Sequence, residues 1–288
     1  MRLQEYGVGV FDVVLTKSAL KKALKKQYIK VNDIIATTAT FINGGECITL
    51  SISEESSPKK KLIFPLDVLF EDEYLAVIHK PAGILVSGNS FKTIANALPQ
   101  NIQRSNLPDA TTPQPVHRLD YATTGILLVG KTSSSIRALN KIFEQRLITK
   151  TYYAVAIGDM NQNGTIKSEV DGKESHSNYA LKESVASERF GTLNLLELEP
   201  LTGRRHQLRQ HLSSIGNPIL GDKEYGTEGL ILHGKGLYLH AYSFMFIHPF
   251  TQEKIKIKDT LPQRFSKIFG DVMCDTKNEV NKPFQHNT

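Results

Sequence analysis

Cysteine is scarce in this sequence, and long apolar runs are missing. The 288 residues include only Cys47 and Cys274, which lie far apart, each without a second cysteine nearby. This spacing argues against a disulfide framework and against a cysteine-based zinc site, and it fits a reducing cytoplasm. No apolar run is long enough to span a bilayer, and residues 1–5 lack the apolar stretch of a secretion signal. We therefore expect a cytoplasmic protein.

The overall composition is typical of a globular protein with a basic surface. Hydrophobic residues make up 40% of the chain and charged residues 22%, which are values that support a packed core. A chain of 288 residues is long enough for one large core and a small additional module. The net charge of +6 and the isoelectric point near 9.1 suit a polyanionic partner without proving one.

Acidic residues are absent from residues 17–30, where basic residues are concentrated. The apolar residues Leu20, Ala23 and Leu24 recur there at helical spacing, and Ser18 is a candidate N-cap. This pattern predicts an amphipathic helix with a basic outer face, followed by short strands. Such a face is either the solvated surface of an ordinary small domain or a surface that binds RNA. The lysines of this segment are Lys17, Lys21, Lys22, Lys25, Lys26 and Lys30.

The chain divides by composition into four parts. Residues 1–53 form the small module, and the polar, proline-bearing residues 54–61 form a linker. Residues 62–270 hold many strand-like segments with helices between them, without the strict alternation of a βαβ fold. We therefore predict an α+β domain with a mixed, largely antiparallel sheet and flanking helices. The polar tail, residues 271–288, is predicted to be disordered.

Hydrophobic periodicity predicts the elements of the large domain. Strands are predicted at residues 62–64, 68–70, 74–78, 126–129, 152–157, 179–184, 192–198, 237–247 and 254–257. Helices are predicted at residues 93–98, 133–146 and 261–269, and another begins after a turn at residues 202–204. The chain between the first of these helices and Pro113 is predicted to be irregular.

The segment from residue 114 to residue 130 carries the residues best suited to chemistry. Its sequence is QPVHRLDYATTGILLVG, and its apolar run, residues 126–129, predicts a buried strand. Asp120 thus lies on a loop at the mouth of a rigid strand, a position where reactive groups are commonly held. Taken alone, however, an aspartate before a strand is more often an ordinary turn residue.

The sequence PVHRLD, followed by TGILLV, resembles the active-site motif of the RluA-type pseudouridine synthases. The resemblance continues through further blocks, which occur in the family's order over residues 62–258. The small module resembles an S4 RNA-binding domain. Together these resemblances imply a pseudouridine synthase catalytic fold behind an S4-like module, acting on RNA. The further blocks are KPAG at 80–83, KTY at 150–152, LTGRRHQLR at 201–209, IGNPILGD at 215–222, LHA at 239–241 and HP at 248–249.

The resemblance also implies which residues perform the chemistry, for which the family needs neither a cofactor nor a metal. Asp120 is the reacting carboxylate, and the guanidinium of Arg209 pairs with it and keeps it charged. Tyr152 stacks on the detached base, and a role as general base is left open. Arg118 fills the gap that the extruded uridine leaves. RNA contacts are further assigned to Arg205, Lys17, Lys21, Lys22, Lys25 and Lys26.

Other residues near the motif are expected to be structural or depart from the family's pattern. Lys80 belongs to a structural motif near the site, and His117 is expected to be structural rather than an acid, a base or a ligand. Tyr121, Thr124 and Arg205 differ from the residues that are common in the family. Of these, Tyr121 and Arg205 could alter contacts to RNA and with them the choice of target.

The expected function is the isomerisation of uridine to pseudouridine in structured RNA. The S4-like module favours 23S ribosomal RNA over a tRNA as the target. A non-catalytic RNA-binding or ribosome-assembly protein with the same fold is the alternative from another class. A nucleoside or glycosyl hydrolase is a weaker alternative, because such enzymes usually use two carboxylates and the motif holds one. The chain is expected to be monomeric.

Overall fold

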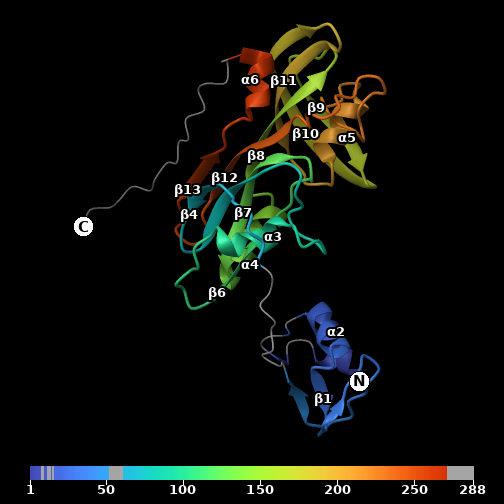
Figure 1. The fold of residues 1–288 in the computed structure, drawn as a ribbon, viewed down its shortest axis with the longest axis vertical. Helices are drawn as coiled ribbons and strands as arrows, with labels where there is room; N and C mark the ends of the chain where they lie inside the picture. The colour runs from blue at the N-terminus through green and yellow to red at the C-terminus, as the bar shows by residue number, and fades with distance from the viewer. Residues whose placement is uncertain (8–9, 12–13, 15, 52–60, 271–288) are drawn as a thin grey trace, which may run out of the picture. The chain divides into compact units, whose positions relative to one another are not determined.

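The chain forms two compact units, Met1–Lys60 and Lys61–Thr288. The computed structural model describes residues 1–7, 10–11, 14, 16–51 and 61–270 (Figure 1). The predicted disordered tail lies outside the described residues, as does the predicted linker apart from Lys61.

The first unit combines two short helices with a small antiparallel sheet. Apolar side chains from both helices and from the sheet share one core. The resemblance of this unit to an S4 domain stays a prediction. Its elements are α1 (Leu3–Tyr6), α2 (Lys17–Lys25), β1 (Ile29–Val31), β2 (Ile34–Ile35) and β3 (Ile48–Leu50), with the strand order β2-β1-β3.

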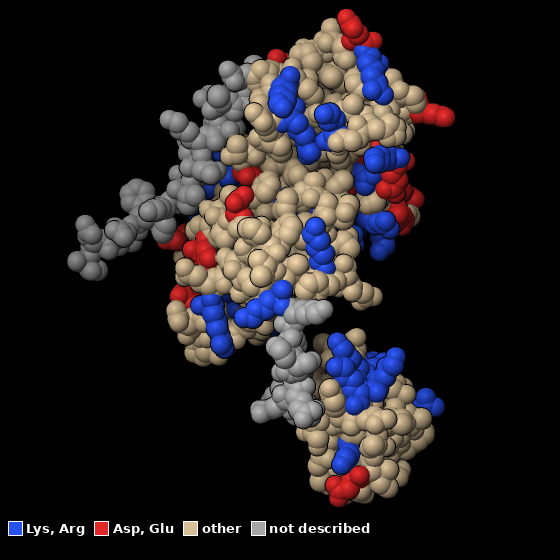
Figure 2. All heavy atoms as spheres, viewed as in Figure 1, with Lys and Arg blue, Asp and Glu red and all other residues tan. Residues whose placement is uncertain are grey.

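Helix α2 is amphipathic, as predicted. Leu20 and Leu24 are buried, while the lysines of the other face are exposed and form a cationic surface (Figure 2). The N-cap is Thr16, whose hydroxyl oxygen accepts a hydrogen bond from the Ala19 amide at 3.1 Å. The prediction of Ser18 as N-cap is wrong, because Ser18 already lies in the first turn and Thr16 has the extended backbone of a cap.

The second unit is built on one large mixed sheet (Figure 1). Its strands run in the order β4-β5-β7-β12-β8-β11-β10-β9, with β6 beside β7 and β13 beside β12. The pair β7 and β12 is parallel, and the other pairs are antiparallel. The predicted α+β class with a largely antiparallel sheet is confirmed. The strands are β4 (Val68–Glu71), β5 (Leu75–Lys80), β6 (Ala110–Pro115), β7 (Thr124–Thr132), β8 (Thr149–Ile157), β9 (Asn163–Val170), β10 (Lys173–Ser187), β11 (Gly191–Pro200), β12 (Leu239–Ile247) and β13 (Lys254–Lys258).

Helices flank this sheet and complete its apolar cores. Helix α4 follows β7 directly, and Thr132 and Ser135 cap it through reciprocal hydrogen bonds. Its Leu139 is fully buried in one core with Val77 of β5 and Leu128 of β7. Within the described residues, no helix has the length and hydrophobicity needed to cross a membrane. The helices are α3 (Ile94–Ala97) with the 3₁₀ turn η1 (Leu98–Gln100), α4 (Ser133–Glu144), α5 (Gln207–Ser214) and α6 (Gln263–Phe269).

Three segments of the second unit differ from the prediction. Residues 62–64 form no strand. The chain predicted to be irregular ends in strand β6, which carries Pro113 and Pro115 and pairs with β7 in an interrupted register; an edge position of this kind tolerates proline. Strand β9 has no counterpart among the predicted strands, because its sequence is mostly polar. It forms by pairing with the longer strand β10.

The parallel contact between β7 and β12 brings two of the sequence blocks together. His240 and Ala241 lie opposite Thr124 and Gly125, and the Thr124 hydroxyl is 2.8 Å from His240 Nδ1. Gly125 has a φ of +113°, and a Cβ atom there would lie 2.2 Å from the Ala241 carbonyl oxygen. Only glycine therefore allows the two strands to approach. This junction holds the end of β7 next to the loop that carries Asp120.

Candidate active site

A cavity of about 250 Å³ opens beside the loop that precedes β7. Asp120, Tyr152 and Arg209, the residues predicted to be catalytic, all line it, and so do Arg118 and Arg205. They come from the loop, from strand β8 and from the start of helix α5. The structure therefore brings together all the predicted site residues of the second unit. The lysines predicted to bind RNA lie in the first unit, on α2 and at its end.

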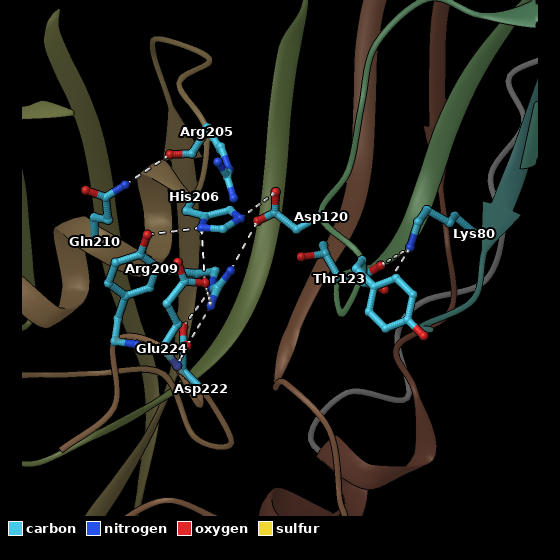
Figure 3. A network of polar contacts seen from close by, with 11 residues as sticks. Lys80, Asp120, Thr123, Arg205, His206, Arg209, Gln210, Asp222 and Glu224 are labelled. Atoms are coloured by element: carbon cyan, nitrogen blue, oxygen red, sulfur yellow. Dashed lines mark hydrogen bonds and ion pairs between the residues drawn. The ribbon is translucent and has the colours of Figure 1, made fainter. Parts of the chain in front are cut away.

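Lys80 holds the loop that carries Asp120. The lysine is the last residue of β5, and it is fully buried. Its ammonium group donates hydrogen bonds to the carbonyl oxygens of Thr123 at 2.8 Å, Pro81 at 3.0 Å and Tyr121 at 3.4 Å (Figure 3). This geometry fits the structural role expected of Lys80. The sequence does not reveal the extent of that role, because a lysine beside a turn is usually exposed.

The burial of Lys80 has a consequence for stability. Desolvation lowers the pKa of Lys80 to about 8, against an opposing effect of the Asp120 charge. Because a lysine in an unfolded chain titrates near 10.4, the unfolded state binds more protons than the folded state between the two values, and stability rises with pH. We expect this group to raise the free energy of unfolding by about 2 kcal/mol between about pH 7.5 and 9.5.

Urea denaturation of wild type and of Lys80→Met at these two pH values measures that contribution. The variant lacks the titrating group, so its stability should rise by about 2 kcal/mol less than that of wild type. Lys173→Met, at an exposed position of β10, is the control and should keep the wild-type pH dependence. An identical pH dependence in wild type and Lys80→Met would contradict the assignment.

Arg209 is held in place by a second aspartate. Its Nε and Nη2 atoms donate to the two carboxylate oxygens of Asp222, each at 2.7 Å, and Nη2 also donates to Glu224 at 3.1 Å. The predicted partner, Asp120, lies farther away, with Arg209 Nη1 and Asp120 Oδ2 3.9 Å apart. The bidentate pair is therefore made with Asp222. The physical reason is burial, because the Asp222 side chain is 0% exposed and a buried carboxylate without a cation is costly.

The pair of Arg209 and Asp222 keeps both groups charged. Burial alone would raise the pKa of Asp222, but hydrogen bonds from Arg209 and from the amides of Glu224 and Tyr225 outweigh it and lower the pKa. Burial would likewise lower the pKa of Arg209, but Asp222, and then Asp120 and Glu224, raise it. The cavity thus holds a permanent positive charge near Asp120. Asp222 ends the sequence block at residues 215–222, but the sequence does not show that it pairs with Arg209.

His206 lies as close to Asp120 as Arg209 does. Its Nε2 atom is 3.6 Å from Asp120 Oδ1, and its Nδ1 atom is 3.0 Å from the Tyr225 hydroxyl and 3.4 Å from the Glu224 carboxylate. Figure 3 shows the imidazole between Asp120 on one side and the Arg209 and Glu224 group on the other. Sequence analysis assigns His206 no role. The signal that could have found it is its place in the same sequence block as Arg209, three residues before it.

Tyr152 supplies the aromatic surface of the cavity. It lies on β8, with β11 and β12 on either side, and its half-buried ring packs against two apolar clusters of the second unit. Burial, and then the charge of Asp120, raise the pKa of its phenol. The hydroxyl group therefore keeps its proton at neutral pH. A flat, uncharged phenol ring next to a carboxylate can stack on a base.

His117 is neutral and belongs to the packing. Its Nε2 atom accepts a hydrogen bond from the Leu128 amide at 2.9 Å, so this nitrogen carries no proton. Its ring stacks on Phe143 at a centroid distance of 4.8 Å, and burial lowers the pKa of His117 to about 3. Across the described parts of the chain, no three His, Cys, Asp or Glu side chains form a metal-binding group.

Comparisons with known proteins agree with one another. A family model described as RNA pseudouridylate synthase matches residues 74–214. Ribosomal large subunit pseudouridine synthase C of Rickettsia prowazekii (strain Madrid E) is 30% identical to this chain, covering 92% of it and 95% of that protein. Ribosomal large subunit pseudouridine synthase D of Nitrosomonas europaea is 29% identical, covering 93% of this chain and 83% of that protein. The solved structure of human RNA pseudouridylate synthase domain containing 4 matches with a TM-score of 0.56 and 25% identity, covering 69% of this chain and 90% of that one.

Proposed function

The chain belongs to the family of RNA pseudouridine synthases, and we propose that it isomerises uridines of 23S ribosomal RNA with Asp120 as the reacting carboxylate and without a cofactor. The observation that carries the proposal is the placement of Asp120 in a cavity with Tyr152, Arg209 and His206. The Rickettsia and Nitrosomonas relatives are named for the large ribosomal subunit, which supports ribosomal RNA as the target. We further propose that the protein acts as a cytoplasmic monomer.

The reaction exchanges one bond for another at C1′ of the ribose. The bond from C1′ to N1 of the uracil breaks, the base turns, and a bond from C1′ to C5 forms. The proton lost from C5 is balanced by the proton gained at N1. A carboxylate can attack C1′ or stabilise the positive charge that develops there. Asp120 suits either task, because His206 Nε2 and Arg209 Nη1 lie 3.6 and 3.9 Å from its two oxygens and can orient them.

Tyr152 is proposed to act as the platform for the detached base. The raised pKa of its phenol disfavours the alternative role as a general base, which would require the phenolate near neutral pH. Stacking needs only the flat face of the ring, and Tyr152 lies on a strand that is paired on both sides. Of the two roles considered for Tyr152, these observations support stacking.

RNA contacts are proposed on both units. Arg118 and Arg205 are exposed and line the cavity, so they can bind phosphates or fill the gap that an extruded uridine leaves. The exposed cationic surface of α2 can bind the RNA backbone independently of its sequence. The residues proposed on that surface are Lys17, Lys21, Lys22, Lys25 and Lys26.

A pseudouridine map of RNA from cells that lack the gene tests the target. We expect one or a few pseudouridines to disappear from 23S ribosomal RNA and to return when the wild-type gene is restored. A loss confined to a tRNA would move the target to that RNA, which is the runner-up. An unchanged map would favour the alternative from another class, a protein that binds RNA without modifying it.

A further inference from the structure

The imidazole of His206 stands between two carboxylates. Nε2 faces Asp120 Oδ1 at 3.6 Å, and Nδ1 faces Glu224 Oε2 at 3.4 Å and the Tyr225 hydroxyl at 3.0 Å. A neutral imidazole carries one N–H group, whereas an imidazolium carries two. Because each nitrogen has a carboxylate oxygen as neighbour, the doubly protonated ring matches this environment best.

The backbone around His206 is built to hold the ring in this direction. His206 is the N-cap residue of α5 and has a left-handed conformation, with φ 54°. A residue other than glycine keeps this conformation only where its surroundings enforce it, since it costs about 1 kcal/mol or more. Here Gln207 fixes the turn, because its Oε1 atom accepts hydrogen bonds from the Thr202 hydroxyl at 2.7 Å and the Arg204 amide at 3.0 Å. The His206 side chain is only 11% exposed.

We infer that His206 is a positioning residue, which as an imidazolium holds one oxygen of Asp120 while Arg209 holds the other. This inference rests on the proposed function and deepens it. Both contacts to Asp120, at 3.6 and 3.9 Å, are longer than the short bonds of Arg209 to Asp222. Two charged donors at this distance orient the carboxylate, and they leave its lone pairs available to C1′.

Charged groups face the ring from three segments. Asp120 on the loop before β7 and Glu224 after α5 are acidic neighbours of the ring, and Arg209 on α5 is a basic group that contacts Glu224. Tyr225 is the remaining titratable neighbour in contact with the ring, and Arg205 precedes His206 in the chain. The contact to Asp120 needs the imidazolium, so activity that depends on this contact should fall as pH rises.

Two substitutions test the two ring nitrogens of His206 separately. The amide nitrogen of glutamine in His206→Gln can replace Nε2, which faces Asp120, whereas that of asparagine in His206→Asn replaces Nδ1, which faces Tyr225 and Glu224. Asparagine also tolerates the left-handed backbone. We expect His206→Gln to lose about tenfold and His206→Asn about 100-fold of the single-turnover rate near pH 5.5, because only the first keeps a contact to Asp120. Neither variant should keep the fall in rate with rising pH.

The rate of pseudouridine formation is measured on total RNA from cells that lack the gene, between about pH 5.5 and 7.5. This window lies below the pKa of Lys80, which is about 8. The wild-type rate should fall several-fold across it. His233→Gln, at an exposed position that does not line the cavity, is the control and should keep the wild-type profile. Thermal unfolding of each variant checks that it is folded.

The outcomes distinguish a positioning role of His206 from a purely structural one. A wild-type rate that stays level over this window would overturn the inference whatever the variants do. Equal losses in His206→Gln and His206→Asn, or a wild-type pH slope in either, would also overturn it and leave His206 with a structural role. If the wild-type protein forms no pseudouridine in this RNA at any pH, the proposed function itself is wrong, and the inference fails with it.

Discussion

Asp120→Asn should abolish pseudouridine formation, with a loss of about 10⁴-fold or more in single-turnover rate. Asparagine has nearly the same shape as aspartate but lacks the negative charge that can attack or stabilise C1′. Arg209 remains paired with Asp222 in this variant, so the cavity keeps its positive charge. RNA affinity should therefore stay within about twofold of wild type, since phosphate contacts depend on basic side chains.

Turnover and binding are measured on the same RNA at one salt concentration, because affinity for RNA varies steeply with salt. Asp171→Asn is the matched control. Asp171 is exposed in the turn between β9 and β10, with a φ of 53° that asparagine tolerates. The Asp171→Asn variant should retain both turnover and RNA binding. Substantial turnover by Asp120→Asn would remove the catalytic assignment, and a parallel loss of binding would instead make Asp120 a contact to RNA.

Arg209→Met should both destabilise the protein and inactivate it. The substitution leaves the buried Asp222 carboxylate without its cation, and breaking a buried pair in this way costs about 3–5 kcal/mol. It also removes the permanent positive charge near Asp120, so we expect the rate to fall by about 10³-fold. Urea denaturation gives the first quantity and single-turnover kinetics the second.

The double variant Arg209→Met with Asp222→Leu separates these two effects. Replacing both partners removes the unpaired carboxylate, so most of the lost stability should return. Activity should not return, because Asp120 still lacks the guanidinium. Recovery of both stability and turnover would mean that Arg209 serves the fold alone. A single variant Asp222→Asn that lost no stability would contradict the importance assigned here to the bidentate pair.

Local patterns predicted the elements whose sequences are unambiguous. Strand β7 has a continuous apolar run, and helix α4 has apolar residues at helical spacing. Both segments have clear ends in the sequence, and both form as expected. Strand β9 is different, because its polar sequence becomes a strand only through β10, and a local pattern cannot show such a partner. For the same reason, the edge strand β6 and its prolines look irregular in the sequence.

The catalytic candidates were predicted by resemblance, whereas the contacts that hold them were not. Motif letters identify Asp120 and Arg209, but they do not show that the guanidinium makes its short bonds to Asp222. Nor do they show that Lys80 bonds to three carbonyl groups around the loop. Apart from the contact of Lys80 with its neighbour Pro81, these contacts join separate segments of the chain, so they follow from tertiary packing. The sequence alone gives His206 no role at the site, because histidine has many roles and its neighbours define which one applies.

The close approach at Gly125 has a consequence for how variants of this protein behave in cells. Any larger residue there would collide with the backbone of Ala241, so the result would be a chain that folds poorly rather than a slower enzyme. Cells remove such chains through chaperones and proteases. A genetic screen that scores only the loss of pseudouridine would therefore recover variants of Gly125 together with variants of Asp120. Immunoblotting would tell them apart, because the Asp120 variant should accumulate normally and the Gly125 variant should not.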